Sequence, residues 1–492
     1  MQALFSRRRD LVGQGYNPRV ENMRREEYPQ LRDATYLDHS GTTLYSTSLV
    51  KSFSADLRKN LYGNPHSHNP SSKLASNSIN SVRLRVLDLF NTDSTKYDVV
   101  FCANATAAIK LVADSFSGHP DGFDYKFHRD AHTSLVGVRE LSKSSHCFLS
   151  DNETDIWLST ERDTTPDGDT KVGLFAWPGQ SNFSGRRLPQ NTWSDCLRHR
   201  HKNYYSLFDA AALAMTKPLD LSDSSAAPDF IALSFYKMFG FPNLGALIVR
   251  RESAGILQSR HYFGGGTVDS LVADVDWKAR KLHGDPHDYL EDGTCAFHSI
   301  VALGHAITSH AKLFGNFASI SLHTASLAVF LAGRLAALTH PRTGIRVVDL
   351  YCEHDYANTR VQGPVITFNL RSASGEWIGY SGVEFAAAEK NIHIRTGGHC
   401  NPGGVAYFCG LSGAEMEQNF KEGHVCGDEN DVMNGKPTGA VRVSLGAMST
   451  VEDVLKFLDF IKEKYIAIES DKEGWRARGS RMARILCSDI RL

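Results

Sequence analysis

The sequence predicts an α/β protein with a mostly parallel sheet in a large domain and a second, smaller α/β domain. Two observations support this prediction. Short runs of β-branched and aromatic residues alternate with amphipathic stretches, which is typical of α/β layering. The runs are also almost continuously apolar, as expected for parallel strands that helices cover on both faces.

The predicted elements follow in chain order. Strands of the large domain are expected at residues 97–101, 172–176, 204–208, 230–233 and 246–249, with a helix at 105–113. A long helix at 322–338 should carry the chain out of this domain. The smaller unit is expected to hold strands at 345–348 and 365–368 and an amphipathic closing helix at 451–468.

A chain of 492 residues is too long for one compact core, so more than one domain is expected. The predicted division has four parts. They are an N-terminal segment over 1–50 that joins the small domain, a large domain over 51–320, a small domain over 321–470 and a charged tail over 471–492.

Composition argues against a nucleic-acid or membrane partner. The formal net charge is -1, and basic residues form only short runs. The nine cysteines have no paired spacing and no CxxC, which indicates reduced thiols and no structural metal site. No apolar stretch approaches the roughly 20 residues that span a bilayer, and the N-terminus lacks the apolar core of a signal peptide. A cytoplasmic protein is therefore expected.

Lys237 is the first candidate for chemistry. It follows the strand at 230–233, at the sheet edge where α/β proteins place their sites. An amine that partial burial keeps neutral can form a Schiff base, although a lysine at a strand end is more often a surface charge. Asp209 ends the strand at 204–208. It could supply the anion that the ring nitrogen of pyridoxal 5'-phosphate (PLP) needs, or it could cap a helix.

The start of the helix at 105–113 is a candidate phosphate site. Ala105 and Thr106 would offer backbone amides and a hydroxyl at the positive end of the helix dipole. A helix capped by Thr106 without any ligand has the same sequence. His132 could stack on a cofactor ring, although a lone histidine is more often structural.

The most informative stretch is residues 392–404, where a predicted strand ends in Arg395 and a glycine-rich loop presents Cys400 beside His399. The glycines and a proline exclude helix and strand from the loop. Neighbouring positive charge lowers the pKa of a thiol, so Cys400 is a candidate nucleophile. The alternative is a tight turn around an inert cysteine, and the arginine, histidine and glycines favour the nucleophile.

Arg442 lies in a run of alternating apolar residues that predicts a strand. If its side chain faces inward, the guanidinium would clamp a substrate carboxylate with two hydrogen bonds. On an edge strand it would instead lie in solvent, and the sequence leaves both open.

Taken together, these motifs resemble the aminotransferase-like domain of molybdenum cofactor sulfurases, which are relatives of bacterial-type cysteine desulfurases. The resemblance covers nearly the whole chain, and several motifs are long and occur in the family's order. The matching stretches are residues 36–46, 63–67, 180–186, 209–212, 234–240, 262–268, 291–294, 395–403 and 435–442.

The resemblance implies a homodimeric PLP-dependent transferase fold of the aspartate aminotransferase type, with a mostly parallel, seven-stranded sheet. It assigns Lys237 to the Schiff base with PLP, Asp209 to the pyridine nitrogen and Cys400 to a persulfide. The remaining implied cofactor contacts are His132 on the ring, Ala105, Thr106, Ser234, Tyr236 and Asn182, and Thr267 from the partner subunit. The implied substrate contacts are Arg442, Asn182, Arg395 and His399.

The implied reaction converts L-cysteine, or a cysteine-like amino acid, to alanine. Lys237 takes the α-proton and the Cys400 thiolate takes the sulfur for an acceptor, either molybdenum cofactor or a protein. Two features differ from the family. Full-length members carry a C-terminal cofactor-binding domain that this chain does not show, and Gly404-Val405 stands where the family loop usually has another cysteine. The resemblance therefore supports the reaction more strongly than the acceptor.

Two other functions fit parts of the sequence. A PLP-dependent carbon–sulfur lyase acting on a cysteine conjugate would use Lys237 and could dispense with Cys400. A catalytically silent binding module would keep the fold alone, and the presence of both Lys237 and Asp209 argues against it.

Overall fold

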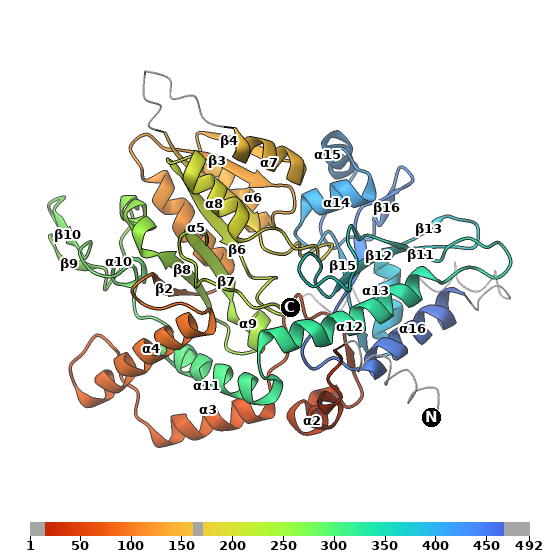
Figure 1. The fold of residues 1–492 in the computed structure, drawn as a ribbon, viewed down its shortest axis with the longest axis horizontal. Helices are drawn as coiled ribbons and strands as arrows, with labels where there is room; N and C mark the ends of the chain where they lie inside the picture. Colours follow the sequence, from red (N-terminus) through yellow and green to blue (C-terminus); the bar gives the residue numbers. More distant parts are fainter. Residues whose placement is uncertain (1–14, 161–170, 467–492) are drawn as a thin grey trace.

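The computed structural model describes residues 15–160 and 171–466. Figure 1 shows two sheets side by side, a larger one on the left and a smaller one on the right. The larger sheet has seven strands in the order β2-β8-β7-β6-β5-β3-β4. They are β2 (Tyr97–Cys102), β3 (Phe123–His128), β4 (Ser144–Phe148), β5 (Val172–Pro178), β6 (Tyr204–Asp209), β7 (Phe230–Ser234) and β8 (Gly245–Arg250).

Six of these strands run in one direction, and β8 runs antiparallel to both of its neighbours, β2 and β7. The mostly parallel sheet expected from the sequence is therefore confirmed, as are its five predicted strands. The reversal of β8 follows from its short connection, because a parallel crossover needs a dozen or more residues and β8 begins soon after β7 ends.

Strands β3 and β4 are absent from the sequence-based expectation. In β3 the polar residues Asp124 and Lys126 interrupt the apolar run, and β4 is an edge strand that begins with exposed polar residues. Neither shows the continuous apolar character that marks the central strands of this sheet.

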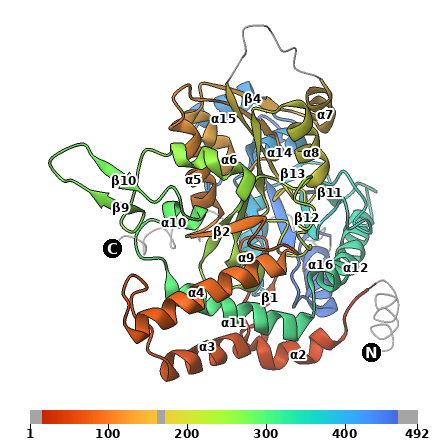
Figure 2. The same ribbon diagram turned by 60° about the vertical axis from the view of Figure 1, so that its left-hand side comes forward.

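Helices cover both faces of the large sheet, so its central strands are buried on both sides. The adjacent residues Val99 and Val100 have no exposed surface and belong to separate cores on the two faces. Figure 2 shows α3, α4 and α11 lying together along the lower side of the molecule. The helices of this part are α2 (Arg19–Glu27), α3 (Thr47–Lys59), α4 (Pro70–Leu89), α5 (Ala105–Ser117), α6 (Thr133–Val136), α7 (Asp151–Ser159), α8 (Asn191–Arg200), α9 (Phe235–Phe239), α10 (Pro286–Leu290) and α11 (Phe297–Phe314).

The smaller sheet is antiparallel and packs on helices of its own, around a core that includes Leu327, Ile366 and Phe457. Its strands are β11 (Val348–Leu350), β12 (Val365–Arg371), β13 (Trp377–Ile378), β15 (Arg395–Gly397) and β18 (Ala440–Ser444). Its helices are α12 (Phe317–Ala336), α13 (Tyr380–Ala388), α14 (Pro402–Cys409), α15 (Gly413–Lys421) and α16 (Val451–Tyr465).

Three further strand pairs complete the fold. The N-terminal strand β1 (Thr35–Tyr36) pairs with β14 (Ile392–His393), and the other pairs are β9 (Val268–Leu271) with β10 (Lys278–Arg280) and β16 (Val432–Met433) with β17 (Lys436–Pro437). The strand expected at 345–348 begins only at Val348, and the one expected to end at Arg395 is instead split into β14 and β15. The four-part domain division stays a prediction, and its tail over 471–492 lies outside the described residues.

Helix α12 is long and apolar enough by composition to cross a membrane, contrary to the expectation that no such stretch exists. More than half of the qualifying window is buried inside the protein, where Leu327 and Leu331 pack in the core of the smaller sheet. Burial of this kind is typical of a core helix in a globular protein.

Candidate active site

Lys237 lies in the short helix α9, directly after the carboxyl end of β7. The N-terminal segment packs closely on this helix, because the amide of Thr43 donates to the carbonyl of Tyr236 at 3.4 Å. Gly240 ends the helix with φ of 78°, and a Cβ there would lie 2.3 Å from the carbonyl carbon of Leu44. Only glycine accepts both conditions, so this residue holds the lysine helix against the N-terminal segment.

The environment of Lys237 favours a neutral amine. Its side chain keeps intermediate exposure, yet desolvation by the surrounding protein lowers its pKa, and the nearby cations Arg442 and Arg395 lower it further. The carboxylates of Asp209 and Asp38 act in the opposite direction. No described residue forms a hydrogen bond or ion pair with the amine. A neutral amine without a partner is the state that a lysine needs to form an imine.

Asp209 ends β6, the strand next to β7, and is 8% exposed. Its Oδ1 accepts from the amide of Ala211 at 2.9 Å within a turn. The alternative that Asp209 caps a helix is therefore wrong, since a turn and not a helix follows it. Its negative charge raises the pKa of Lys237 and His132, which places all three groups in one electrostatic environment.

The N-terminus of α5 approaches the same sheet edge. Asn104 caps this helix by accepting from the amide of Ala107, so the alternative of a Thr106 cap is wrong. The amide of Ala105 donates to Ser234 Oγ at 2.9 Å. Gly245 permits the close approach, because a Cβ at this position would lie 2.4 Å from Cα of Asn104.

Hydroxyl groups converge beside this helix start. Thr106 Oγ1 lies 2.7 Å from Ser134 Oγ, and the same Ser134 hydroxyl lies 2.8 Å from His132 Nδ1. Amides and hydroxyls at a helix N-terminus form a suitable site for a phosphate dianion. The sequence reasoning named Thr106 and Ser234 but missed Ser134, which lay two residues beyond His132.

His132 has a structural role as well as a place in the site. Its Nδ1 accepts from the amide of Ser134 at 3.1 Å and so caps the short helix α6. Burial lowers its pKa and Lys237 lowers it further, while Asp209 raises it. The imidazole is therefore neutral near pH 7.

The Cys400 loop docks onto the segment that carries His132. The amide of Thr133 donates to the carbonyl of Cys400 at 2.9 Å, and Asn401 Nδ2 donates to the carbonyl of Asp130 at 3.1 Å. A Cβ on Gly403 would lie 2.1 Å from the carbonyl oxygen of Arg129, so only glycine fits this contact. The expectation that the glycines and proline exclude helix and strand is correct only for residues 398–401, because β15 extends to Gly397 and α14 begins at Pro402. The Cys400 side chain in this short loop is exposed.

The backbone at His399 and Cys400 is strained, with φ of 53° and 54°. His399 itself is buried, and neither ring nitrogen has a hydrogen-bond partner at ordinary geometry, although the backbone of Ala440 lies close enough to raise its pKa. Burial lowers its pKa well below the usual range, and Arg442 and Arg395 add to the effect. Two such costs in one dipeptide are expected at a functional site.

Asn182 links this loop to Arg442. Its Nδ2 donates to the carbonyl of His399 at 2.6 Å, and its own carbonyl accepts from Arg442 Nη1 at 2.9 Å. Arg442 Nη2 donates to Asp38 Oδ1 at 2.8 Å, and Arg395 lies 3.6 Å from the other oxygen of Asp38. Asp38 was missed as a single residue, although it lies in the first of the matched motifs.

Arg442 faces inward. Its strand β18 lies between β12 and β15, and its side chain is 3% exposed, so the solvent-exposed alternative is wrong. Its Nε has no hydrogen-bond partner, and burial lowers the pKa of the guanidinium. Arg395, in contrast, is 49% exposed at the margin of the site.

Thr267 is not brought to this site within one chain. Its hydroxyl donates to the carbonyl of Gly264 at 2.7 Å, just before the β9–β10 hairpin that projects from the left of the molecule in both views. Tyr236 contributes its backbone carbonyl, as described above, next to Lys237.

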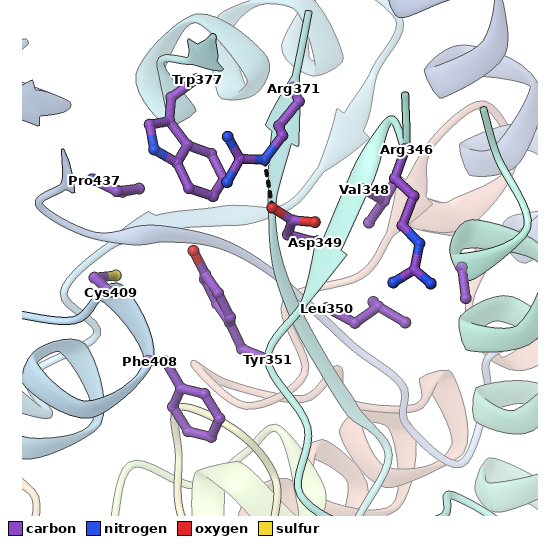
Figure 3. Close-up of a pocket in the computed structure, with 11 residues that line it drawn as sticks. Arg346, Val348, Asp349, Leu350, Tyr351, Arg371, Trp377, Phe408, Cys409 and Pro437 are labelled. Carbon is purple, nitrogen blue, oxygen red and sulfur yellow. Dashed lines mark hydrogen bonds and ion pairs between the residues drawn. The ribbon is translucent and has the colours of Figure 1, made fainter. Parts of the chain in front are cut away.

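A separate cavity of about 530 Å³ opens on the smaller sheet. Figure 3 shows the Tyr351 hydroxyl pointing toward Trp377 and Cys409, beside the ion pair of Arg371 with Asp349. None of the predicted site residues lines this cavity.

Three features define the class of protein. They are a partly buried lysine after one strand of a mostly parallel sheet, an aspartate at the end of the next strand, and a small antiparallel domain. This is the PLP-dependent transferase fold of the aspartate aminotransferase type. The chain belongs to the class-V aminotransferase family, whose model matches residues 35–457.

Within this family, the chain is most informatively compared with individual curated proteins. The chain is 50% identical over 470 residues to the molybdenum cofactor sulfurase of Aspergillus clavatus, covering 93% of this chain and 55% of that protein. It thus spans about half the length of the curated relatives it matches.

Solved structures share the fold at low identity. A cysteine desulfurase from Thermococcus onnurineus matches with a TM-score of 0.68 at 18% identity, covering 90% of this chain and 97% of that chain. A cystine C-S lyase in complex with cysteine persulfide matches with a TM-score of 0.63 at 16% identity, covering 88% and 98%.

Proposed function

We propose that this chain binds PLP at Lys237 and removes sulfur from L-cysteine, leaving L-alanine and a persulfide on Cys400. The docking of the Cys400 loop carries the proposal. Its bonds to Thr133 and Asn182 hold an exposed thiol beside the site that contains Lys237 and Arg442. Similarity to molybdenum cofactor sulfurases supports the same reaction.

The residues present fit PLP. Lys237 offers an amine that no described residue binds, and Asp209 offers a carboxylate for the ring nitrogen. The start of α5, with the Ser234 and Thr106 hydroxyls and the Ala105 amide, suits the phosphate. When bound, PLP supplies an electron sink that allows bonds near the α-carbon of an amino acid to break.

Different side chains of the protein would then bind the substrate and move its α-proton. The unpartnered Nε of Arg442 is the best donor for the substrate carboxylate, since a buried donor gains most from a charged acceptor. Lys237 Nζ, with its lowered pKa, takes the α-proton. Neutral His132 adds no positive charge beside the ring.

The proposed sulfur transfer balances in atoms and electrons without an added oxidant. A bond forms between Cys400 Sγ and the substrate sulfur while the substrate carbon–sulfur bond breaks. The sulfur is oxidised to the persulfide level, the β-carbon is reduced, and the proton of the Cys400 thiol ends formally on the methyl group of alanine. The persulfide sulfur then passes to an acceptor, for which we propose molybdenum cofactor because of the relatives' name.

We also propose a homodimer in the cytoplasm. Every cysteine in the described residues is a free thiol, as expected for a reducing compartment. The β9–β10 hairpin exposes large apolar side chains, including Val275 at 59% and Trp277 at 53%, which a second copy could cover. The family resemblance would place Thr267 at the partner's phosphate site, which requires a local rearrangement because its side chain is fully buried in its own chain.

The test uses PLP-loaded protein and labelled cysteine, with alanine release and persulfide mapping by mass spectrometry. Cys400→Ala should abolish the persulfide and lower alanine release by about 10²-fold or more, as loss of a nucleophile does. The matched control is Cys426→Ala, another exposed cysteine, which should leave both unchanged. Absence of alanine from the native protein would end the desulfurase proposal.

The alternative carbon–sulfur lyase predicts a different result. A lyase acting on a cysteine conjugate would retain turnover in Cys400→Ala, because its chemistry needs Lys237 but no protein thiol. Retained turnover with a conjugate and none with cysteine would favour the lyase.

A further inference from the structure

Among the described residues, one buried arginine has no carboxylate partner. The buried arginines of the described chain are Arg83, Arg186, Arg187, Arg260 and Arg442. Four of them pair with acids, through Glu291, Asp130, Asp292 and Asp38. Arg187, at 5% exposure, has no ion pair within the described residues.

Neutral acceptors surround Arg187 instead. Its Nε donates to Gln180 Oε1 at 2.9 Å and its Nη2 to Thr216 Oγ1 at 3.2 Å, while Nη1 donates to the carbonyl of Thr359. These three bonds give each guanidinium nitrogen one acceptor, but within the described chain they leave two N–H groups free and the positive charge without an acid.

Two more cations adjoin these partners. Lys217 follows Thr216, Arg360 follows Thr359, and Lys217 Nζ donates to the carbonyl of Arg360 at 3.3 Å. Neither forms an ion pair with an acid among the residues that the structure describes. Burial, and then the charges of Arg187 and Arg360, lower the pKa of Lys217 to about 8, and burial lowers that of Arg187 to about 9.

Three positive charges without an acid are unfavourable where one of them is buried, because buried charges are normally paired. We propose that Arg187, Lys217 and Arg360 bind a multiply charged oxyanion of the phosphate or sulfate type. Such an anion would give Arg187 a negatively charged partner. The other four buried arginines obtain theirs from acidic side chains of the protein.

This site is separate from Lys237 and does not depend on the proposed reaction. The site nonetheless lies next to the loop that carries Asn182, because Gln180 and Arg187 form a β-bridge at the base of that loop. An anion bound there would brace the loop that holds the His399 carbonyl.

The test measures binding to PLP-loaded protein by calorimetry and thermal unfolding. The probes are inorganic phosphate, sulfate and glycerol 3-phosphate, each compared with chloride at equal ionic strength. Arg360→Gln and Lys217→Gln remove charge from the site. Arg58→Gln and Lys51→Gln make the same changes on exposed positions of α3.

We expect the oxyanions to bind and to raise the melting temperature more than chloride does. Each site variant should weaken binding about tenfold, the factor for one charge-assisted hydrogen bond of roughly 1.4 kcal/mol, and the α3 variants should not. Tighter binding of glycerol 3-phosphate than of phosphate would identify a phosphate ester as the ligand, and equal binding a free anion. Binding that is absent, or equal in all variants, would overturn the proposal.

Discussion

At the scale of single residues, the proposed chemistry depends on the Lys237 amine. Replacing Lys237 by Ala should lower turnover by about 10²–10⁴-fold, because the variant lacks the group that we propose takes the α-proton. Borohydride reduction followed by mass spectrometry should attach a PLP-derived mass to Lys237 in the native protein and to no lysine in the variant. Lys51→Ala, an exposed lysine on α3, should behave as the native protein. An adduct that persists in Lys237→Ala would place the cofactor elsewhere.

His323 makes stability depend on pH. Its Nδ1 accepts from the amide of Asn17 at 3.1 Å, and its Nε2 lies 3.0 Å from the carbonyl of Ser449. Burial lowers its pKa to about 4 from an ordinary 6.5. Between these values the unfolded chain binds a proton that the folded chain does not, so stability is complete above pH 6.5 and falls as pH decreases toward 4.

The expected loss of unfolding free energy is roughly 3 kcal/mol over that range, because the pKa differs by about 2.5 between the unfolded and the folded chain. Urea unfolding at several pH values measures it. His323→Phe should be less stable at pH 7, because Asn17 and Ser449 lose a partner, but its stability should fall less steeply with acid. The exposed His261→Phe should keep the native pH dependence. An unchanged slope in His323→Phe would show that another group is responsible.

At the scale of elements, two glycines allow the cost of backbone strain to be compared with the cost of a steric clash. Gly240 and Gly375 both have positive φ, 78° and 86°. A Cβ at Gly240 would meet the backbone of Leu44 at 2.3 Å, whereas at Gly375 the nearest atom lies 3.8 Å away. Gly375→Ala should therefore cost about 1 kcal/mol, from strain alone.

Gly240→Ala adds a steric clash and should cost more than about 2 kcal/mol. It should also displace α9 and weaken PLP binding, which the cofactor's absorbance in a titration would report. Equal costs in the two variants would mean that the N-terminal segment does not pack on α9 in solution.

The sequence predicted those elements whose pattern is local. Continuous apolar runs predicted the central strands. The glycines after Arg395 were a poorer guide, because β15 extends to Gly397 and α14 begins at Pro402, so only residues 398–401 form the expected loop. The partners of Arg442 were beyond reach, because Asp38 lies more than four hundred residues away and meets it only through tertiary packing. The same holds for the bond from Thr133 to Cys400, which no local pattern encodes.

At the scale of the whole molecule, the proposed homodimer would form through the β9–β10 hairpin. The β9–β10 hairpin projects from the body, and its side chains Val275 and Trp277 are more than half exposed. Covering a tryptophan stabilises an association by roughly 1.5–3 kcal/mol, so its replacement by a charged residue should be disruptive.

Trp277→Glu should raise the dimer dissociation constant by about tenfold or more, measured by analytical ultracentrifugation over a range of concentrations. If Thr267 reaches the partner's phosphate site, the variant should also bind PLP more weakly at concentrations where it is monomeric. Ile156→Glu, which changes a side chain of similar exposure on α7, should affect neither property. A Trp277→Glu protein that remains as dimeric as the native one would exclude the hairpin from the interface and leave Thr267 without a role in the site.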